Sequence, residues 1–185
     1  MNVKHVGIVG AGTMGNGIAQ AFAVAGVPVT MTDVGAAPLE RALKSIDTSL
    51  ERLVRKDKMT AADKAAALAR IQTSTSLDAL RAADLVIEAA TENLDLKLEI
   101  FSRIDQVAKA DAVIATNTSS ISITRLAAAT KRPDQVIGMH FFNPVPVMQL
   151  VELIKGLQTS DATYAAAEAI AKKIGKTPVK VKNSP

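Results

Sequence analysis

The stretch VGIVGAGTMGNGIAQAFAVAG, residues 6–26, decides the fold of this 185-residue chain. An apolar run over residues 3–9 predicts a buried strand, and residues 18–25 repeat apolar side chains at helical spacing. Three glycines between these segments have the spacing GxGxxG: Gly10, Gly12 and Gly15. The stretch therefore predicts a strand, a tight turn and a helix, which together begin a βαβ unit.

An acidic residue follows the next strand. Asp33 ends the apolar run of residues 27–32, about twenty residues beyond the glycines, where a dinucleotide-binding unit carries the group that binds the adenosine ribose. The glycines permit the turn, the approach of backbone to pyrophosphate and close helix packing, while the helix N-terminus attracts phosphate. No Arg follows Asp33 to hold a 2′-phosphate, which favours NAD over NADP. A glycine-rich turn without nucleotide and a capping role for Asp33 are the alternatives.

The remaining chain continues the alternation of strands and helices. Further short strands are predicted at residues 85–89, 113–116, 136–140 and 178–181, with helical patterns such as residues 94–107 between them. Strands rich in Val and Ile that alternate with helices predict an α/β fold with a Rossmann-type, doubly wound, mostly parallel sheet. We expect residues 1–185 to form one NAD-binding domain.

A helical hairpin is predicted as an insert at about residues 38–70. Six apolar residues of its first helix fall on one face: Leu39, Leu43, Ile46, Leu50, Leu53 and Val54. Thr60 and Asp63 have the spacing of a capping box for a second helix that ends near Arg70. The polar face of the first helix is basic. It is therefore either a solvated surface or a lid over an anionic ligand, and the periodicity does not choose between them.

Composition excludes several classes of protein. Without Cys the chain can form neither a disulfide framework nor a thiolate metal site, and we expect no metal. The net charge of +4 suits an anionic ligand, but Lys and Arg are spread along the chain rather than massed as in nucleic-acid-binding arms. No apolar run is long enough to span a bilayer and no secretory signal is visible. We expect a soluble cytoplasmic protein that binds neither nucleic acid nor membrane.

The segment HFFNPVPVMQLVE, residues 140–152, begins with a group that titrates near neutral pH. His140 ends a predicted strand, so it lies at the edge where α/β sheets bind ligands. An isolated histidine is more often a core or surface residue, which is our interpretation of His5, the other histidine of the chain.

Four motifs together resemble the NAD-binding domain of L-3-hydroxyacyl-CoA dehydrogenases: GIVGAGTMGNGIAQ, EAATENLDLK, TNTSSISI and HFFNPVPVMQLVE. The short bacterial 3-hydroxybutyryl-CoA dehydrogenases are part of this family, and the resemblance covers essentially the whole chain. It implies NAD-dependent oxidation of (S)-3-hydroxyacyl-CoA to 3-ketoacyl-CoA. It also implies the reverse reaction on a substrate such as acetoacetyl-CoA.

The resemblance assigns the chemistry to three residues. His140 would be the general base in oxidation and the general acid in reduction, because a group with a pKa near the working pH transfers the hydroxyl proton best. Glu152, on a following strand, would orient the imidazole and stabilise its cation. Ser119 would bond the substrate oxygen near the nicotinamide. From the pattern alone a capping role for Ser119 stays open, since Ser120 and Ser122 also precede a helical pattern.

The same resemblance implies two sets of binding residues. The cofactor set is Gly10, Gly12, Thr13, Met14, Gly15, Asp33, Glu92, Lys97, Ser119 and Asn143. The set for the CoA substrate is Ser49, Lys56 and Ser119, with Lys56 pairing with a CoA phosphate. By pattern alone Glu92 is an ordinary helix-start residue, and Asn143 is a turn residue before Pro144.

The family implies a second, mainly helical domain beyond these residues. It would supply an Asn to the catalytic centre, cover the cleft and form a homodimer interface. We expect the domain present here to bind NAD and to be weakly active alone. Two alternatives stay open. One is an NAD-binding module without chemistry. The other is a dehydrogenase of a non-thioester 3-hydroxy acid, a group that uses a Lys of the second domain in place of the His–Glu pair.

Overall fold

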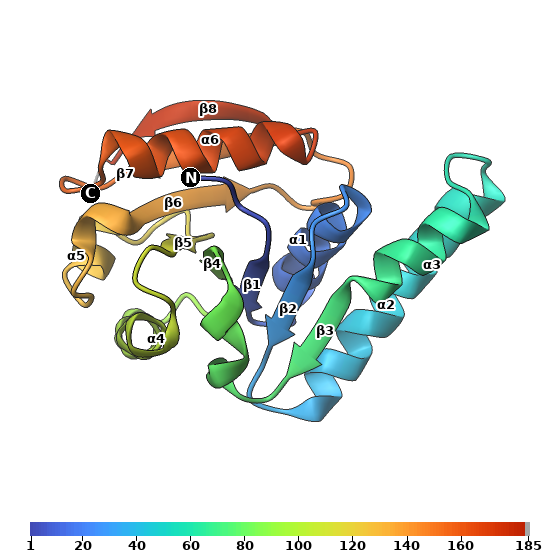
Figure 1. Ribbon diagram of the computed structural model, residues 1–185, viewed down its shortest axis with the longest axis horizontal. Coiled ribbons are helices and arrows are strands. Elements are labelled where there is room, and N and C mark those ends of the chain that lie inside the picture. Colours follow the sequence, from blue (N-terminus) through green and yellow to red (C-terminus); the bar gives the residue numbers. More distant parts are fainter. Residues whose placement is uncertain (184–185) are drawn as a thin grey trace.

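The computed structural model describes residues 1–183, within which eight strands form a single sheet (Figure 1). The strand order is β3-β2-β1-β4-β5-β6-β7-β8. The strands are β1 (Val6–Val9), β2 (Val29–Thr32), β3 (Ile71–Ser74), β4 (Leu85–Glu88), β5 (Val113–Thr116), β6 (Val136–Phe141), β7 (Leu150–Lys155) and β8 (Thr177–Lys182). The helices are α1 (Thr13–Val24), α2 (Ala36–Arg55), α3 (Ala61–Ala69), α4 (Leu94–Val107), α5 (Ile123–Ala127) and α6 (Asp161–Lys173), with the 3₁₀-helices η1 (Leu77–Ala82) and η2 (Pro133–Gln135).

Hydrophobic packing covers the central strands on both faces. Every residue of β1, β2, β4 and β5 is buried, as expected for parallel strands between helices. Along β4, Leu85 and Ile87 pack into one cluster and Val86 packs into the other. The first cluster contains side chains of α1, α2 and α6, and the second contains side chains of α4 and α5. None of the helices within the described residues combines the length and apolarity needed to cross a bilayer.

The strand order confirms the predicted doubly wound, Rossmann-type sheet. Strand β1 lies between β2 and β4 and is parallel to both. The chain moves outward from β1 in one direction and then returns to continue in the other, which creates a switch point at the carboxyl ends of these strands. Strand β7 pairs antiparallel with β6 and parallel with β8, so the last two strands run opposite to the others.

Strand β3 was not predicted, because its sequence carries little hydrophobic signal. Only Ile71 of the sequence IQTS is buried, and Gln72 and Thr73 are exposed at the edge of the sheet. An edge strand contacts one neighbour only, so its solvent-facing residues need not be β-branched or apolar.

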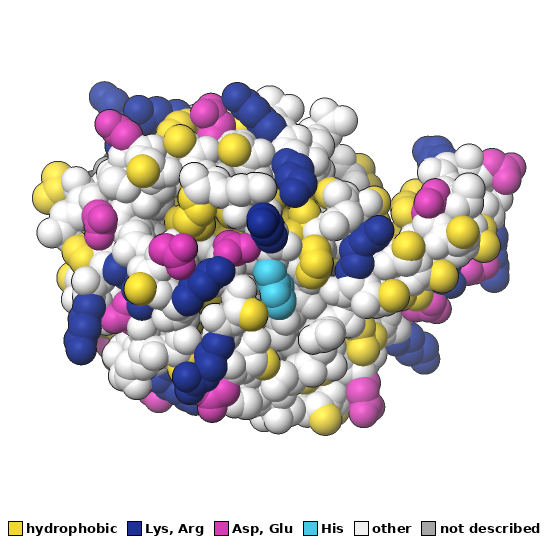
Figure 2. Space-filling view, in the orientation of Figure 1, with side chains coloured by type: hydrophobic (Ala, Val, Ile, Leu, Met, Phe, Trp, Pro, Cys, Tyr) yellow, Lys and Arg dark blue, Asp and Glu magenta, His cyan; other side chains and the backbone are white. Residues whose placement is uncertain are grey.

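Helices α2 and α3 occupy the region predicted as an inserted hairpin, and they project from the body of the molecule as an arm (Figure 1). Figure 2 shows basic, acidic and hydrophobic side chains mixed along this arm, with a gap between the arm and the body. The Thr60 hydroxyl accepts a hydrogen bond from the Asp63 amide at 3.0 Å, which is one half of the predicted capping box. The last two residues of the predicted domain lie outside the described residues.

Candidate functional site

The glycine-rich turn has the geometry that its spacing predicts. Gly10 has a φ of +105°, and a Cβ there would lie 2.6 Å from the Ala89 carbonyl oxygen. A Cβ on Gly15 would lie 1.8 Å from the Gly10 carbonyl oxygen, so the helix packs too closely on the strand for any side chain. Around Gly12, by contrast, a Cβ would meet no described atom within 4 Å. The Gly12 position therefore leaves open space in front of the first turn of α1, where a phosphate group fits.

Asp33 lies beside this turn and lines a cleft of about 260 Å³. Its carboxylate accepts hydrogen bonds from the amides of Ala11 at 2.8 Å and Val34 at 2.7 Å. The other residues that line the cleft are mostly apolar: Val9, Gly10, Thr32, Val34, Thr75, Leu77, Ala90, Leu96, Glu99, Ile100 and Arg103. An apolar cleft with one fixed carboxylate at the switch point of an α/β sheet suits the adenosine part of a dinucleotide.

His140 and Glu152 face each other across two antiparallel strands. They are directly opposite in the register of β6 and β7, and His140 Nδ1 lies 3.9 Å from Glu152 Oε1. Their side chains are 19% and 30% exposed. This separation is an ion-pair distance, longer than a hydrogen bond. The Phe142 ring packs on the imidazole with ring centroids 4.5 Å apart. The expected place of Glu152 on the strand after His140 is confirmed.

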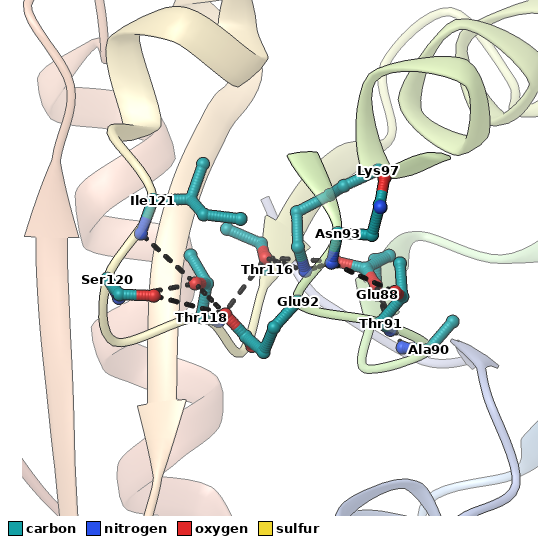
Figure 3. Close-up of polar contacts among 10 residues, drawn as sticks. All are labelled: Glu88, Ala90, Thr91, Glu92, Asn93, Lys97, Thr116, Thr118, Ser120 and Ile121. Carbon is teal, nitrogen blue, oxygen red and sulfur yellow. Dashed lines mark hydrogen bonds and ion pairs between the residues drawn. The ribbon is translucent and has the colours of Figure 1, made fainter. Parts of the chain in front are cut away.

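Ser119 joins this pair in a second cleft of about 290 Å³. Ser119 is exposed in the loop between β5 and α5, and its two neighbours hold this loop in place. The Thr118 and Ser120 hydroxyls both donate to Oε2 of Glu92, at 2.8 Å and 3.2 Å (Figure 3). These two hydrogen bonds join the loop after β4 to the loop after β5. The cap of α5 is Ser122, whose hydroxyl accepts from the Arg125 amide, which leaves the Ser119 hydroxyl free of a capping role.

A buried ion pair lies behind these loops and was not predicted. The Lys97 ammonium contacts the carboxylate of Glu88 and lies 3.3 Å from the Thr116 hydroxyl (Figure 3). The side chains of Lys97 and Glu88 are 1% and 0% exposed. The other oxygen of Glu88 accepts from the Ala90 amide at 2.8 Å. A charged residue at the end of the otherwise apolar strand LVIE was the available signal for Glu88. The expected contact of Lys97 with a cofactor stays a prediction, and in this structure its ammonium points inward.

The remaining predicted residues lie outside the two clefts. Asn143 is exposed in the β6–β7 loop and precedes a cis peptide bond to Pro144. Ser49 of α2 accepts a hydrogen bond from Gln20 of α1 at 3.0 Å, and Lys56 is exposed at the end of α2. Thr13 and Met14 begin α1. The structure thus brings Ser119, His140 and Glu152 together, brings Gly10 and Asp33 together, and keeps the hairpin residues on the arm.

The second histidine has a structural environment. His5 Nε2 lies 2.8 Å from the Thr30 hydroxyl. Burial is the largest influence on its pKa, which is lowered, and the nearby Asp84 carboxylate opposes this shift. His5 lies at the amino end of β1, whereas both clefts lie toward the carboxyl ends of the parallel strands. Among the residues that the structure describes, no group of three or more His, Cys, Asp or Glu could hold a metal ion.

Comparison with known proteins places this architecture in a family. Residues 5–184 match the family described as 3-hydroxyacyl-CoA dehydrogenase, NAD binding domain. A 3-hydroxybutyryl-CoA dehydrogenase of Bradyrhizobium diazoefficiens is 49% identical over 94% of this chain and 59% of its own length. One from Clostridioides difficile is 44% identical over 96% of this chain and 63% of its own length.

A solved structure agrees with these relatives. The crystal structure of (S)-3-hydroxybutyryl-CoA dehydrogenase from Ralstonia eutropha superposes with a TM-score of 0.98 and 61% identity, over 100% of this chain and 65% of that one. The chain thus spans about three-fifths of the length of the relatives that it matches. Because the match runs through the glycine turn, both clefts and the arm, the chain belongs to the family of 3-hydroxyacyl-CoA dehydrogenase NAD binding domains.

Proposed function

We propose that this chain carries out NAD-dependent oxidation of (S)-3-hydroxyacyl-CoA to 3-ketoacyl-CoA and the reverse reduction, with acetoacetyl-CoA and 3-hydroxybutyryl-CoA as the substrate pair. The observation that carries the proposal is the meeting of Ser119, His140 and Glu152 at one cleft. The names of the relatives support the substrate class.

His140 is the proton-transfer group of the proposed reaction. As a base it withdraws the proton of the substrate 3-hydroxyl, and as an acid it returns that proton to the ketone oxygen. Glu152 faces Nδ1, so it favours the tautomer with the proton on that nitrogen and leaves Nε2 to act on the substrate. Its negative charge also stabilises the imidazolium that forms.

Ser119 binds the same substrate oxygen. A hydroxyl is both donor and acceptor, so Ser119 can stay bonded as that oxygen changes from alcohol to ketone. The hydrogen bonds from Thr118 and Ser120 to Glu92 hold the loop that carries Ser119 in place. The Ser119 hydroxyl therefore loses less conformational freedom when substrate binds.

The residues at the sheet edge fit NAD. The open space at Gly12 admits the pyrophosphate next to the amides of Thr13 and Met14, and Asp33 accepts hydrogen bonds from the adenosine ribose. Glu92, Lys97 and Asn143 complete the proposed set toward the nicotinamide end, and the buried Lys97 acts there through Glu88, whose other oxygen accepts from the Ala90 amide. NAD held by these residues would supply the hydride acceptor for oxidation, and NADH would supply the hydride donor for reduction.

The arm is the proposed site for CoA. Lys56 and the exposed Arg52 lie one turn apart near the end of α2 and present positive charge to the CoA phosphates. Ser49 lies on the same side, although its hydroxyl already accepts from Gln20. The arm thus holds the nucleotide part of the thioester while Ser119 and His140 act on the acyl part.

The part of the relatives that lies beyond the match, about two-fifths of their length, is proposed to complete the substrate cleft and to form a homodimer interface. Without a wall over the cleft, water competes at the reacting atoms. We therefore expect residues 1–185 to bind NAD well and to turn over more slowly than a protein that includes the remaining part. We also propose a cytoplasmic location.

The test is the loss of NADH absorbance on addition of acetoacetyl-CoA, with this chain and with the chain extended by the C-terminal part of a relative. His140→Gln should lower the rate by about 10²- to 10⁴-fold. His5→Gln is the matched control, because it changes the only other histidine and should leave the rate unchanged. Equal rates for His140→Gln and wild type would refute the proposal. Saturation with free acetoacetate but not with its CoA ester would instead indicate a non-thioester substrate.

A further inference from the structure

The loop over residues 142–149 joins the strand of His140 to the strand of Glu152 and carries Asn143. A lysine from a distant part of the chain holds this loop. Lys176, in the turn between α6 and β8, donates from Nζ to the carbonyl oxygens of Val145 at 2.5 Å and Met148 at 2.7 Å. The loop therefore depends on a contact that lies about thirty residues farther along the sequence.

Lys176 is partly buried, and this burial lowers the pKa of its ammonium group. It forms no ion pair with a carboxylate among residues 1–183. An ammonium that loses water without gaining a counter-ion is unfavourable unless its donors are satisfied. The carbonyl oxygens of Val145 and Met148 satisfy these donors, so the position of the Lys176 ammonium depends on its two hydrogen bonds to the loop.

The other side of the loop packs against the helix that starts at the glycine turn. Val145 is 2% exposed, and a Cβ added to Gly17 of α1 would lie 3.0 Å from the Val145 Cβ. Within the loop, the amides of Val147 and Met148 both donate to the Pro144 carbonyl oxygen, at 3.0 Å and 2.9 Å. The loop is therefore a compact turn held between α1 on one side and Lys176 on the other.

We propose that Lys176 is a positioning residue that fixes the β6–β7 loop, and with it Asn143, relative to α1 and to the His140–Glu152 pair. The proposal rests on the proposed function for the roles of these three residues. In the proposed function, one end of the cofactor binds at the N-terminus of α1 and the other end reaches His140. The β6–β7 loop lies between these two places, because it follows the strand of His140 and packs on α1 through Val145. Lys176 fixes the distance between α1 and His140 by holding the loop against the start of β8. The Thr177 amide also donates there to the Gln149 carbonyl oxygen at 2.8 Å.

Lys176→Met tests the proposal, because Met keeps most of the apolar stem and removes the donors. Loss of two charge-assisted hydrogen bonds should weaken NADH binding about tenfold and slow NADH consumption with acetoacetyl-CoA about tenfold, with a KM for the thioester within about twofold of wild type. Lys176→Arg retains donors and should restore most of both losses. Lys173→Met is the matched control, since Lys173 is an exposed lysine at the end of α6, and it should change neither.

Amide hydrogen exchange gives a readout that does not depend on activity. In Lys176→Met the Val147 and Met148 amides should exchange about tenfold faster, while amides of β4 and β5 keep their protection. Gly17→Ala is a second variant, which presses on Val145 from the opposite side. It should reproduce the loss of NADH affinity if Lys176→Met does not fold.

The outcomes separate this proposal from the proposed function. Faster loop exchange and weaker NADH binding, in a protein that never reduces acetoacetyl-CoA, would support the role of Lys176 and refute the reaction. Turnover that depends on His140 but is the same in wild type and Lys176→Met, with unchanged exchange of the loop amides, would overturn the role of Lys176. A lower melting temperature with unchanged kinetics and NADH affinity below that temperature would also overturn it, because it would show a role in stability alone.

Discussion

A lysine–carboxylate pair lies at each end of β4, and the two pairs differ in their surroundings. At the amino end, Asp84 pairs with Lys109, and these side chains are 16% and 37% exposed. At the carboxyl end, Glu88 pairs with Lys97, and both are almost completely buried. Each carboxylate also accepts hydrogen bonds from backbone amides: Lys4 and His5 for Asp84, Ala90 and Thr91 for Glu88.

The difference shows which edge of the sheet is built for binding. The pair at the amino end ties the N-terminal segment to β4 through the amides of Lys4 and His5, which is a role in stability. The pair at the carboxyl end lies beside the loops that carry Glu92 and Thr118 (Figure 3). Burying two charges is unfavourable by itself, and a hydrophobic pair would often be as stable. The buried pair is therefore best explained by the shape it imposes on the ligand-binding edge.

Breaking the buried pair should have the largest effect. Lys97→Met leaves the Glu88 carboxylate without its cation, and we expect the free energy of unfolding to fall by about 3–5 kcal/mol. Urea denaturation followed by circular dichroism measures this change. NADH affinity should fall as well, because Glu88, which accepts from the amide of Ala90, loses the cation that holds its carboxylate in place.

The double variant Lys97→Met, Glu88→Gln is the control for this explanation. With no charge left in the site, it should recover part of the lost stability and little of the NADH affinity. A double variant that is less stable than Lys97→Met would show that the penalty does not come from an uncompensated carboxylate.

Asp84→Asn should have an intermediate effect that depends on pH. Although burial opposes ionisation, the hydrogen bonds from Lys109 and from the backbone amides of Lys4 and His5 lower the pKa of Asp84 below its ordinary value of 3.8. A carboxylate with a lowered folded-state pKa stabilises the protein above its unfolded-state pKa, and this stabilisation is lost as the pH falls through the folded-state value. The variant should therefore be less stable by about 1–3 kcal/mol at pH 7.

Stability curves from pH 7 down to pH 2 test this sign. The difference between wild type and Asp84→Asn should stay constant down to about pH 5, shrink through the acid range and be smallest at the lowest pH. A difference that grows as the pH falls would contradict the assignment of the shift to Asp84. NADH affinity should not change, because Asp84 is at the opposite end of the strand from the clefts.

The sequence predicts those parts of this molecule that repeat or that carry a motif. Periodic apolar residues predict the central strands and α4, and the spacing of Gly10, Gly12 and Gly15 with Asp33 predicts the dinucleotide turn. The fold prediction is confirmed by the strand order. His140 and Glu152 lie on two strands that follow each other in the sequence. The antiparallel register of these two strands is enough to place the two side chains opposite each other.

The missed features depend on contacts or positions that exist only in the folded structure. Glu88 looks like the polar end of a strand until Lys97 folds back over it from α4. Lys176 looks like one more surface lysine until β8 brings it against the β6–β7 loop. Strand β3 is polar because an edge has little to bury. The charge at the end of LVIE marks Glu88 as unusual, but no local pattern names its partner, and none marks Lys176 or β3.

Lys109→Met should have the smallest effect and gives the sharpest form of the comparison. It removes the lysine of the amino-end pair, just as Lys97→Met removes that of the carboxyl-end pair. Lys109 is partly exposed, so water replaces much of the lost interaction, and Asp84 keeps its two amide donors. We expect a loss of about 1 kcal/mol or less, unchanged NADH affinity, and a smaller loss at high salt because exposed pairs are screened. If Lys109→Met and Lys97→Met were equally destabilising and equally affected by salt, burial would not be what separates the two ends of β4.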